Sequence, residues 1–329
     1  MPSPTIIDVS LRDGGYLNHW QFSQAEIKTA LTVATAAGVD LIEVGYLDDA
    51  KDLPATAACT AKDLEQWRKH TDKGLAGMIR PAVKNPEQVL QNRQGHFELL
   101  RIPVDLRAPQ RAIRMAELCH HYGFSCTFNF TSANCFSLDR ISECSRQSPK
   151  FLKAIYLADS RGSMRIEDVA PLIGAVRRGW SGAIGYHAHD NLGLAYKTTE
   201  SALEAGCSWV DASIAGVGLG GRNLSLQAVF QLIQKRAKAP DKRSHSALKS
   251  AALHTQEKDI GLPPPGEELA IFQKGAQHNL RMEWIGPLIN AFGLQTSFTV
   301  IDTLPVQNWF EPEDLQAFLT PSQWKKIQW

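Results

Sequence analysis

Residues 154–187 read AIYLADSRGSMRIEDVAPLIGAVRRGWSGAIGYH, and this stretch decides the fold. It begins with a short apolar run, residues 154–158, and it ends with another, residues 183–187. Between them, residues 166–178 carry apolar side chains at the three- and four-residue spacing of an amphipathic helix. Two strands joined through a helix in this way lie parallel in one sheet. The stretch therefore predicts one strand–helix–strand unit of an α/β protein.

The same unit recurs from the N-terminus to about residue 237. Eight strand-like runs alternate with eight helical segments, which is the pattern of a (β/α)₈ TIM barrel. A doubly wound open sheet also alternates and is the alternative fold. The predicted strands are residues 6–10, 41–45, 75–79, 97–102, 125–130, 154–158, 183–187 and 209–214. The predicted helices are residues 23–37, 55–69, 86–93, 109–121, 138–147, 166–178, 194–205 and 224–237.

The composition of the chain changes after Lys238. Residues 239–246 are polar and contain proline, and further helical patterns follow at residues 246–260, 267–279, 282–292 and 311–318. We therefore expect a catalytic barrel at residues 1–238 and a C-terminal helical extension, residues 239–329, packed on the barrel. The extension is rich in tryptophan, which favours packing within it or at the interface of a homo-oligomer.

The bulk composition excludes several classes of protein. The chain has 35 basic and 34 acidic side chains, so its formal net charge is +1. It lacks the excess of positive charge that is typical of proteins that bind nucleic acid. No run of about 18 apolar residues predicts a membrane span, and no secretory signal is visible. The six cysteines are scattered without a C-x-x-C pair, which is typical of reduced thiols in a cytoplasmic protein.

Polar residues gather at the predicted strand ends, where (β/α)₈ barrels carry their chemistry. His187 and His189 lie two residues apart at the end of the seventh strand, so both imidazoles leave the same face. Asp13 follows the first strand and offers a carboxylate. An isolated H-x-H pair most often only forms hydrogen bonds at a strand end. With Asp13 beside it, the pair favours a site for a divalent metal ion.

Other charged and amide side chains near the strand ends are candidates for substrate binding. Arg12 is placed to stabilise negative charge developing on a substrate oxygen, and it is also the natural ion-pair partner of the buried Glu43. Arg80, Arg101 and Asn129 are candidates for binding a substrate carboxylate, although polar residues at strand ends can equally be structural.

Residues 216–223 contain four glycines and could let backbone amides approach a phosphate or a carboxylate. This segment lacks the patterns of a nucleotide-binding loop, so a nucleotide site is not expected there.

The motifs of the chain, taken together, resemble those of the DRE-TIM metallolyases, the HMGL-like superfamily. The superfamily includes 4-hydroxy-2-oxovalerate aldolase, hydroxymethylglutaryl-CoA lyase, isopropylmalate synthase and homocitrate synthase. The matching motifs occur in the family's order across residues 7–227. They are Asp8-Val9-Ser10-Leu11-Arg12-Asp13-Gly14, Ile42-Glu43-Val44-Gly45, Leu157-Ala158-Asp159-Ser160, His187-Ala188-His189-Asp190-Asn191-Leu192-Gly193, and Val210-Asp211-Ala212-Ser213 through Asn223.

The resemblance implies roles for individual residues. It implies that Asp13, His187 and His189 are ligands of a divalent ion, Mn²⁺ or Mg²⁺, with Asn223 as a further ligand or a residue supporting the ligands. It also implies that Arg12 stabilises an enolate oxygen, that Glu43 is the carboxylate of the motif's name, and that Ser160 lies in the substrate site.

The activity that the resemblance implies is cleavage or formation of a carbon–carbon bond next to a 2-oxo acid. The first hypothesis is an aldolase that converts a 4-hydroxy-2-oxo acid to pyruvate and an aldehyde through a metal-stabilised enolate. The alternative is a Claisen-type synthase that joins an acyl-CoA to a 2-oxo acid, and the third is an inactive barrel that serves as a binding subunit. Aldolases of this kind often pair with an acylating aldehyde dehydrogenase, which is therefore the protein partner that the resemblance implies.

One position departs from the family. The third residue after the strand 1 aspartate is histidine in the hydroxy-oxovalerate aldolases and usually glutamine in the lyases and synthases, but here it is Tyr16. A phenol with an ordinary pKa near 10 is a poor base, so Tyr16 is predicted to donate or relay a proton. His19, three residues further, is the other candidate for this role, and a surface position for it is equally compatible with the sequence.

Overall fold

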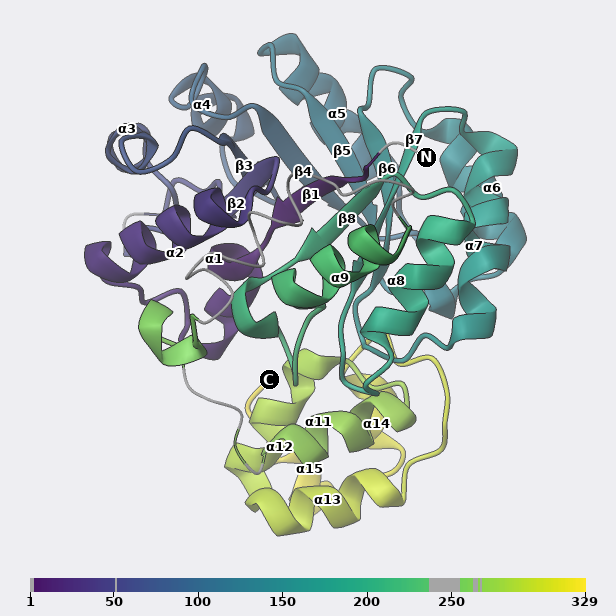
Figure 1. Ribbon diagram of the computed structural model, residues 1–329. Coiled ribbons are helices and arrows are strands. Elements are labelled where there is room, and N and C mark those ends of the chain that lie inside the picture. The colour runs from purple at the N-terminus through teal and green to yellow at the C-terminus, as the bar shows by residue number, and fades with distance from the viewer. Residues whose placement is uncertain (1–2, 51, 237–254, 263–265, 267) are drawn as a thin grey trace.

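The computed structural model describes residues 3–50, 52–236, 255–262, 266 and 268–329. Eight parallel strands close into a single barrel in sequence order, with β8 pairing with β1, and helices surround the barrel (Figure 1). The predicted TIM barrel is therefore confirmed. The strands are β1 (Thr5–Asp8), β2 (Leu41–Tyr46), β3 (Gly74–Met78), β4 (Leu99–Val104), β5 (Cys126–Phe130), β6 (Ala154–Asp159), β7 (Ala183–Ala188) and β8 (Trp209–Ala212).

The helices of the barrel follow the strands in alternation. They are α1 (Ser10–Asp13), α2 (Gln24–Ala37), α3 (Ala61–Arg68), α4 (Pro86–Gln91), α5 (Gln110–His121), α6 (Leu138–Gln147), α7 (Ile166–Gly179), α8 (Ala195–Glu204) and α9 (Leu226–Arg236). Short 3₁₀ turns lie at η1 (Gly14–Leu17), η2 (Ala133–Cys135) and η3 (Ile214–Gly216). Strands such as β6 are buried on every residue, as expected where helices cover one face and the barrel interior the other.

Two predicted boundaries near the strand ends were wrong for local reasons. The first strand ends at Asp8 rather than residue 10, because the Asp8 carboxylate accepts hydrogen bonds from the backbone N and Oγ of Ser10 and turns the chain into α1. The helix predicted at residues 55–69 begins only at Ala61. Thr60 caps it by accepting a hydrogen bond from the backbone N–H of Asp63, so residues before Thr60 stay outside the helix.

The C-terminal extension forms a layer of its own at one end of the barrel (Figure 1). Its elements are α11 (Glu268–Gln277), η6 (Met282–Trp284), α12 (Ile285–Phe292), α13 (Leu294–Asp302), α14 (Glu313–Gln316) and α15 (Pro321–Trp324), whereas η5 (Glu257–Ile260) packs against α2 of the barrel. The segments predicted at residues 267–279 and 282–292 are helical. The segment predicted at 311–318 is helical only at α14, and α13 and α15 were not predicted. The helix predicted at 246–260 and the domain boundary at 238/239 fall mostly outside the described residues.

The extension has its own hydrophobic core and is also bonded to the barrel. Ten buried side chains from Ile271 to Ile327 pack together within it. Arg161, after β6, donates hydrogen bonds to the backbone oxygens of Asn279 (2.8 Å) and Trp309. These bonds hold the extension against the ends of the strands where the polar residues gather. None of the described helices is long and apolar enough to cross a membrane.

Candidate active site

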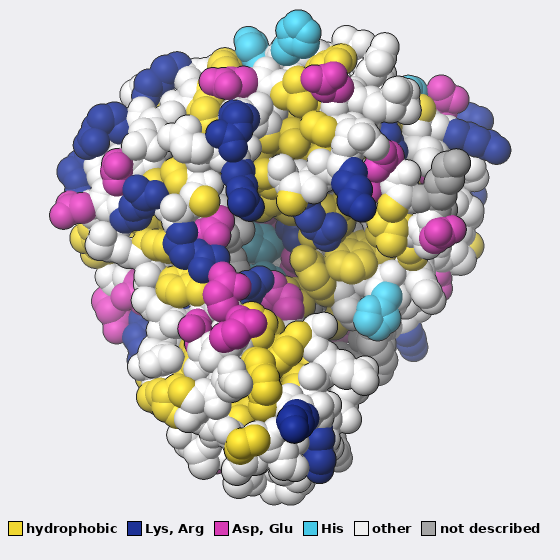
Figure 2. All heavy atoms as spheres, turned by 180° about the vertical axis from the view of Figure 1, so that it is seen from behind, with side chains coloured by type: hydrophobic (Ala, Val, Ile, Leu, Met, Phe, Trp, Pro, Cys, Tyr) yellow, Lys and Arg dark blue, Asp and Glu magenta, His cyan; other side chains and the backbone are white. Residues whose placement is uncertain are grey.

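A pocket of about 310 Å³ opens at the C-terminal ends of the strands, partly under the extension. Figure 2 shows this face, with a hollow near its centre that is bordered by basic and acidic side chains. The barrel supplies most of the wall, and Arg281, Glu283 and Phe310 from the extension complete it. From the predicted site, the structure brings to this wall the residues Arg12, Asp13, Tyr16, Asn129, Ser160, His187 and His189.

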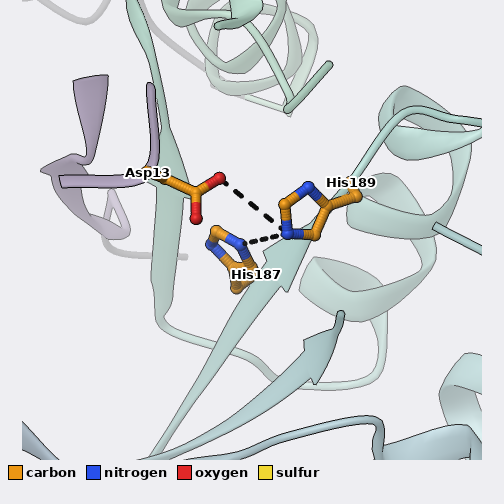
Figure 3. A group of neighbouring side chains, drawn as sticks. All are labelled: Asp13, His187 and His189. Carbon is orange, nitrogen blue, oxygen red and sulfur yellow. Dashed lines mark hydrogen bonds and ion pairs between the residues drawn. The ribbon is translucent and has the colours of Figure 1, made fainter. Parts of the chain in front are cut away.

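Asp13, His187 and His189 converge on one point of the pocket (Figure 3). One ligand atom from each lies within 4.8 Å of the others, and all three side chains are buried. The two Nε2 atoms are 3.2 Å apart, and Nε2 of His189 is 3.8 Å from Oδ2 of Asp13. Asp13 comes from α1 and the histidines from β7 and its end, so the barrel closure at β1, β8 and β7 brings them together.

Two further side chains orient this group. Oδ2 of Asp211, on β8, lies 2.9 Å from Nδ1 of His187, which fixes the imidazole so that Nε2 faces the other two ligands. Asn223 donates from Nδ2 to Oδ2 of Asp13 at 2.7 Å. Partners of this kind are typical of residues that hold metal ligands in place. The structure thus places the amide of Asn223 on Asp13.

The donor set fits a divalent cation. With the His187 Nδ1 proton directed at Asp211, the atoms that face one another are a lone pair on Nε2 and the carboxylate of Asp13. Burial lowers the pKa of His189 to about 4, so this imidazole is neutral near pH 7. The two Nε2 atoms are within hydrogen-bond distance of each other, and when neither carries a proton the three buried donors leave a position that a cation would fill. Two imidazoles and a carboxylate suit first-row divalent metals and Mg²⁺.

A chain of buried ion pairs runs beneath the pocket from Asp13 to His187. Arg12 donates to Oδ1 of Asp13 (2.5 Å) and to Oε2 of Glu43 (2.8 Å). Arg101 donates to the same oxygen of Glu43 (3.0 Å) and to Oδ2 of Asp211 (2.6 Å). Burial raises the pKa of Asp13, but the charge of Arg12, the two neighbouring histidines and the hydrogen bond from Asn223 together outweigh burial and hold that pKa well below its ordinary value.

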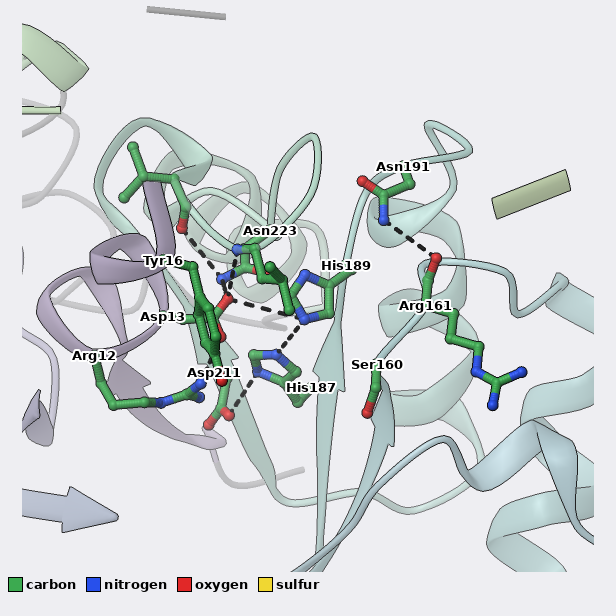
Figure 4. Close-up of polar contacts among 12 residues, drawn as sticks. Arg12, Asp13, Tyr16, Ser160, Arg161, His187, His189, Asn191, Asp211 and Asn223 are labelled. Carbon is green, nitrogen blue, oxygen red and sulfur yellow. Dashed lines mark hydrogen bonds and ion pairs between the residues drawn. The ribbon is translucent and has the colours of Figure 1, made fainter. Parts of the chain in front are cut away.

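The charged residues that the sequence placed in the site occupy two different environments. Arg12 lines the pocket, whereas the side chains of Glu43 and Arg101 are fully buried in the barrel interior and bonded to one another. In Figure 4, Ser160 stands across His187 from Arg12, and its Oγ accepts a hydrogen bond from the backbone N–H of Ser132 (3.0 Å). Asn129 lines the wall between these sides at the end of β5.

Tyr16 forms a pair with a residue that the sequence did not indicate, Tyr46. Their hydroxyl oxygens are 3.0 Å apart, and both rings line the pocket. Burial, and then the neighbouring Tyr46, raise the pKa of Tyr16 well above its ordinary value. Tyr16 is therefore a neutral phenol near pH 7, which can donate a proton but does not accept one without giving up its own.

Trp20 holds the turn that carries Arg12 and Tyr16. Its indole Nε1 donates to the backbone oxygen of Arg12 at 2.8 Å, and its ring packs edge-on against Tyr16. The indole also covers Gly15, where a Cβ would come within 2.1 Å of a ring carbon. His19, next to Trp20, is exposed and is not among the residues that line the pocket.

Comparison with known proteins finds similarity to one family of enzymes. Residues 105–260 match the HMGL-like family model. The match covers 156 of the 329 residues, just under half of the chain. It is 23% identical to the oxaloacetate decarboxylase of Mycobacterium tuberculosis over 322 residues, 95% of each chain. It is 26% identical to the 4-hydroxy-2-oxovalerate aldolase of Thermus thermophilus over 258 residues, 72% of this chain and 70% of the relative.

A solved structure agrees on the fold of the chain. The HMG-CoA lyase of Brucella melitensis superposes with a TM-score of 0.60 over 75% of this chain and 97% of that one, at 17% identity. The predicted resemblance to the DRE-TIM metallolyases is confirmed by these findings.

Proposed function

We propose that this HMGL-like chain is a divalent-metal-dependent lyase that cleaves a 4-hydroxy-2-oxo acid to pyruvate and an aldehyde. The observation that carries the proposal is the convergence of Asp13, His187 and His189 in a pocket that Arg12 also lines. Relatives named as 4-hydroxy-2-oxovalerate aldolases, at 22–26% identity, support the same reaction class. None of the relatives that support this proposal is named as an acyl-CoA synthase.

Asp13, His187 and His189 would hold the ion, Mn²⁺ or Mg²⁺, with Asn223 and Asp211 orienting two of them. A divalent ion at this position would act as a Lewis acid on the oxo group of the substrate. Arg12, fixed by Glu43, directs its guanidinium to the same pocket and stabilises the negative charge that develops on the oxo oxygen. Ser160 and Asn129 are placed to bind the substrate carboxylate from the facing wall.

Tyr16 is the residue that moves protons in this proposal. When the bond between C3 and C4 breaks, C3 needs a proton and the hydroxyl on C4 must lose one. The neutral Tyr16 hydroxyl gives its proton to C3 and takes the proton of the C4 hydroxyl, so it ends the step in the form in which it began. Tyr46, 3.0 Å away, orients the hydroxyl of Tyr16 for both transfers.

The same residues favour a second candidate reaction, the decarboxylation of oxaloacetate. Here the bond between C3 and C4 breaks with loss of CO₂, so C3 needs a proton donor and no base is required. Tyr16, whose raised pKa keeps its hydroxyl protonated, is the candidate donor for this reaction. A relative over 95% of both chains is named oxaloacetate decarboxylase.

Pyruvate release from each substrate tests both candidates. We expect the Mn²⁺-loaded protein to form pyruvate from 4-hydroxy-2-oxovalerate, from oxaloacetate or from both, followed by coupled oxidation of NADH with lactate dehydrogenase. Addition of EDTA and the substitution His187→Ala should each abolish release, whereas the exposed His121→Ala should retain it. Release that is equal with and without the metal would contradict the proposal.

A further inference from the structure

Arg80 lines the pocket but takes no part in the chemistry described above. It follows β3, and the carbon at the centre of its guanidinium lies 3.9 Å from the centroid of the Tyr46 ring. This is a cation–π contact, in which the flat guanidinium is held on a ring face. A guanidinium held in this way keeps its N–H donors free for a planar anion.

The other pocket arginines already have hydrogen-bond partners. Arg12 is bonded to Asp13 and Glu43. Arg107 is bonded to Asp105 and Glu311, at 2.7 and 2.8 Å. The last two are Arg281, which donates to the backbone oxygen of Phe310, and Arg161, which donates to backbone oxygens of the extension.

Arg80 differs from all four. Within the part of the chain that the structure describes, its guanidinium has a ring contact with Tyr46 but no hydrogen bond or ion pair. The N–H donors of this guanidinium have no hydrogen-bond partner, and an aromatic ring holds its plane. Such an arginine beside a substrate pocket is suited to bind a carboxylate or a phosphate.

The position of Tyr46 relates Arg80 to a particular part of the substrate. This step rests on the proposed function, in which the C4 hydroxyl meets the hydroxyl of Tyr16. The Tyr16 hydroxyl is 3.0 Å from that of Tyr46, and Arg80 covers the ring of Tyr46. The group attached to C4, on the far side from the 2-oxo acid, therefore extends toward Arg80.

We propose that Arg80 binds a second anionic group at this far end, so that the preferred ligand is a five-carbon 2-oxo acid with a carboxylate at each end. Substrates that end in a methyl group, such as 4-hydroxy-2-oxovalerate, leave the donors of Arg80 without an anion. A charge-assisted hydrogen bond of this type changes affinity by about ten- to a hundredfold.

The preference for a second anionic group can be measured without turnover by comparing the binding of two ligands of equal length. 2-Oxoglutarate and 2-oxovalerate both have five carbons and differ in a terminal carboxylate against a methyl group, and neither carries the C4 hydroxyl that aldol cleavage needs. Calorimetry with the Mn²⁺-loaded full chain should give a dissociation constant for 2-oxoglutarate at least tenfold below that for 2-oxovalerate. In Arg80→Gln the ratio of the two constants should fall toward one, and Arg80→Lys should recover part of it.

Arg111→Gln is the matched control. Arg111 is exposed on α5 and carries the same charge, but it is not among the residues that line the pocket. This variant should keep the wild-type ratio. Equal affinities for the two ligands in the wild type, or a ratio that Arg80→Gln does not change, would overturn the inference.

The inference and the proposed function fail in different ways. A protein that cleaves 4-hydroxy-2-oxovalerate but binds the two ligands equally keeps the function and loses the Arg80 site. A protein that prefers 2-oxoglutarate through Arg80 but releases no pyruvate from any substrate keeps the Arg80 site and loses the function.

Discussion

Oδ2 of Asp211 lies 2.9 Å from Nδ1 of His187, and the same oxygen accepts a hydrogen bond from Arg101 at 2.6 Å. The carboxylate thus orients a candidate metal ligand, His187, at the pocket, and Arg101 in the barrel interior fixes the carboxylate in turn. Its pKa is lowered, because the charge of Arg101 and the bond to His187 outweigh the effect of burial. Asp211 therefore connects the ionic network under the pocket to the metal ligands.

Replacing Asp211 with asparagine should weaken metal binding about 10- to 100-fold, as is typical when a partner of a metal-ligating histidine is lost. The amide removes the negative charge that directs the His187 proton to Nδ1. Titration with Mn²⁺, followed by electron paramagnetic resonance of the free ion, measures the affinity. Asp139→Asn, at the exposed start of α6, is the control and should bind Mn²⁺ as the wild type does. An unaltered affinity in Asp211→Asn would show that Asp211 does not support His187.

Replacing Glu43 with glutamine should lower the free energy of unfolding by about 3–5 kcal/mol. Oε2 of Glu43 accepts from both Arg12 and Arg101, and none of the three side chains is more than 7% exposed. Without the carboxylate, two buried guanidinium groups lose a counter-charge. Glu143→Gln breaks an exposed pair with Arg140, and its effect should stay below about 1 kcal/mol. Urea unfolding of both variants compares them, and equal effects would contradict a structural role for the network.

Replacing Tyr16 with phenylalanine should lower kcat about 10²- to 10⁴-fold with little change in KM, because the hydroxyl acts on the reacting carbon and not in binding. Tyr46→Phe removes only the partner that orients this hydroxyl, so kcat should fall about tenfold or less. Steady-state pyruvate release from the better of the two substrates measures both. A Tyr16→Phe protein with full kcat would exclude Tyr16 from the proton transfer.

His189 should remain neutral until the pH approaches 4, because burial lowers its pKa from 6.5 to about 4. Between these values the unfolded chain binds the proton and the folded chain does not. Acidification from pH 6.5 toward 4 therefore destabilises the metal-free fold through this ring, and stability returns as the pH rises. Nuclear magnetic resonance of the metal-free protein, with the signal assigned by His189→Gln, follows the titration. A midpoint at or above 6.5 would contradict the buried, neutral imidazole.

The sequence predicted the barrel and the grouping of His187 and His189 because both depend on local patterns. Strand and helix periods alternate clearly, and His187 and His189 leave one face of β7 whatever the register of the neighbouring strands. Predicting that Asp13 lies near the two histidines also required the strand order, because β8 pairs with both β1 and β7 and so brings their ends close together. The ordering of strands in a closed barrel supplies that step.

The sequence did not indicate Tyr46 as a pocket residue, because regular strand alternation predicts that its side chain faces away from the barrel interior. Glu43 and Tyr46 are three residues apart, so a regular strand would direct them to opposite faces. The register between β2 and β3 shifts between these two residues, and Tyr46 joins the pocket wall. Gly45 permits the bulge, since its φ is +153° and a Cβ there would lie 2.0 Å from the backbone oxygen of Thr56. The glycine in Ile42-Glu43-Val44-Gly45 was the available signal.

The contribution of the extension to the pocket could not be predicted from the sequence. Arg281, Glu283 and Phe310 reach the wall because hydrogen bonds such as those from Arg161 join the extension to the barrel. Such contacts between distant parts of a chain depend on packing that has no local period. The sequence also suggested Arg101 for substrate binding, because it lies near a strand end. In the structure Arg101 is fully buried and forms ion pairs with Glu43 and Asp211.

Entry of deuterium into the methyl group of pyruvate tests the central claim most directly, because both candidate reactions form pyruvate by placing a proton on C3. The protein is incubated with pyruvate in D₂O and Mg²⁺ or Mn²⁺, the reaction is stopped with EDTA, and the methyl signal is measured by proton nuclear magnetic resonance. We expect exchange with the wild type and metal, and none with EDTA present from the start or with His187→Ala. Absence of exchange in the metal-loaded wild type, or equal exchange in His187→Ala, would contradict the account.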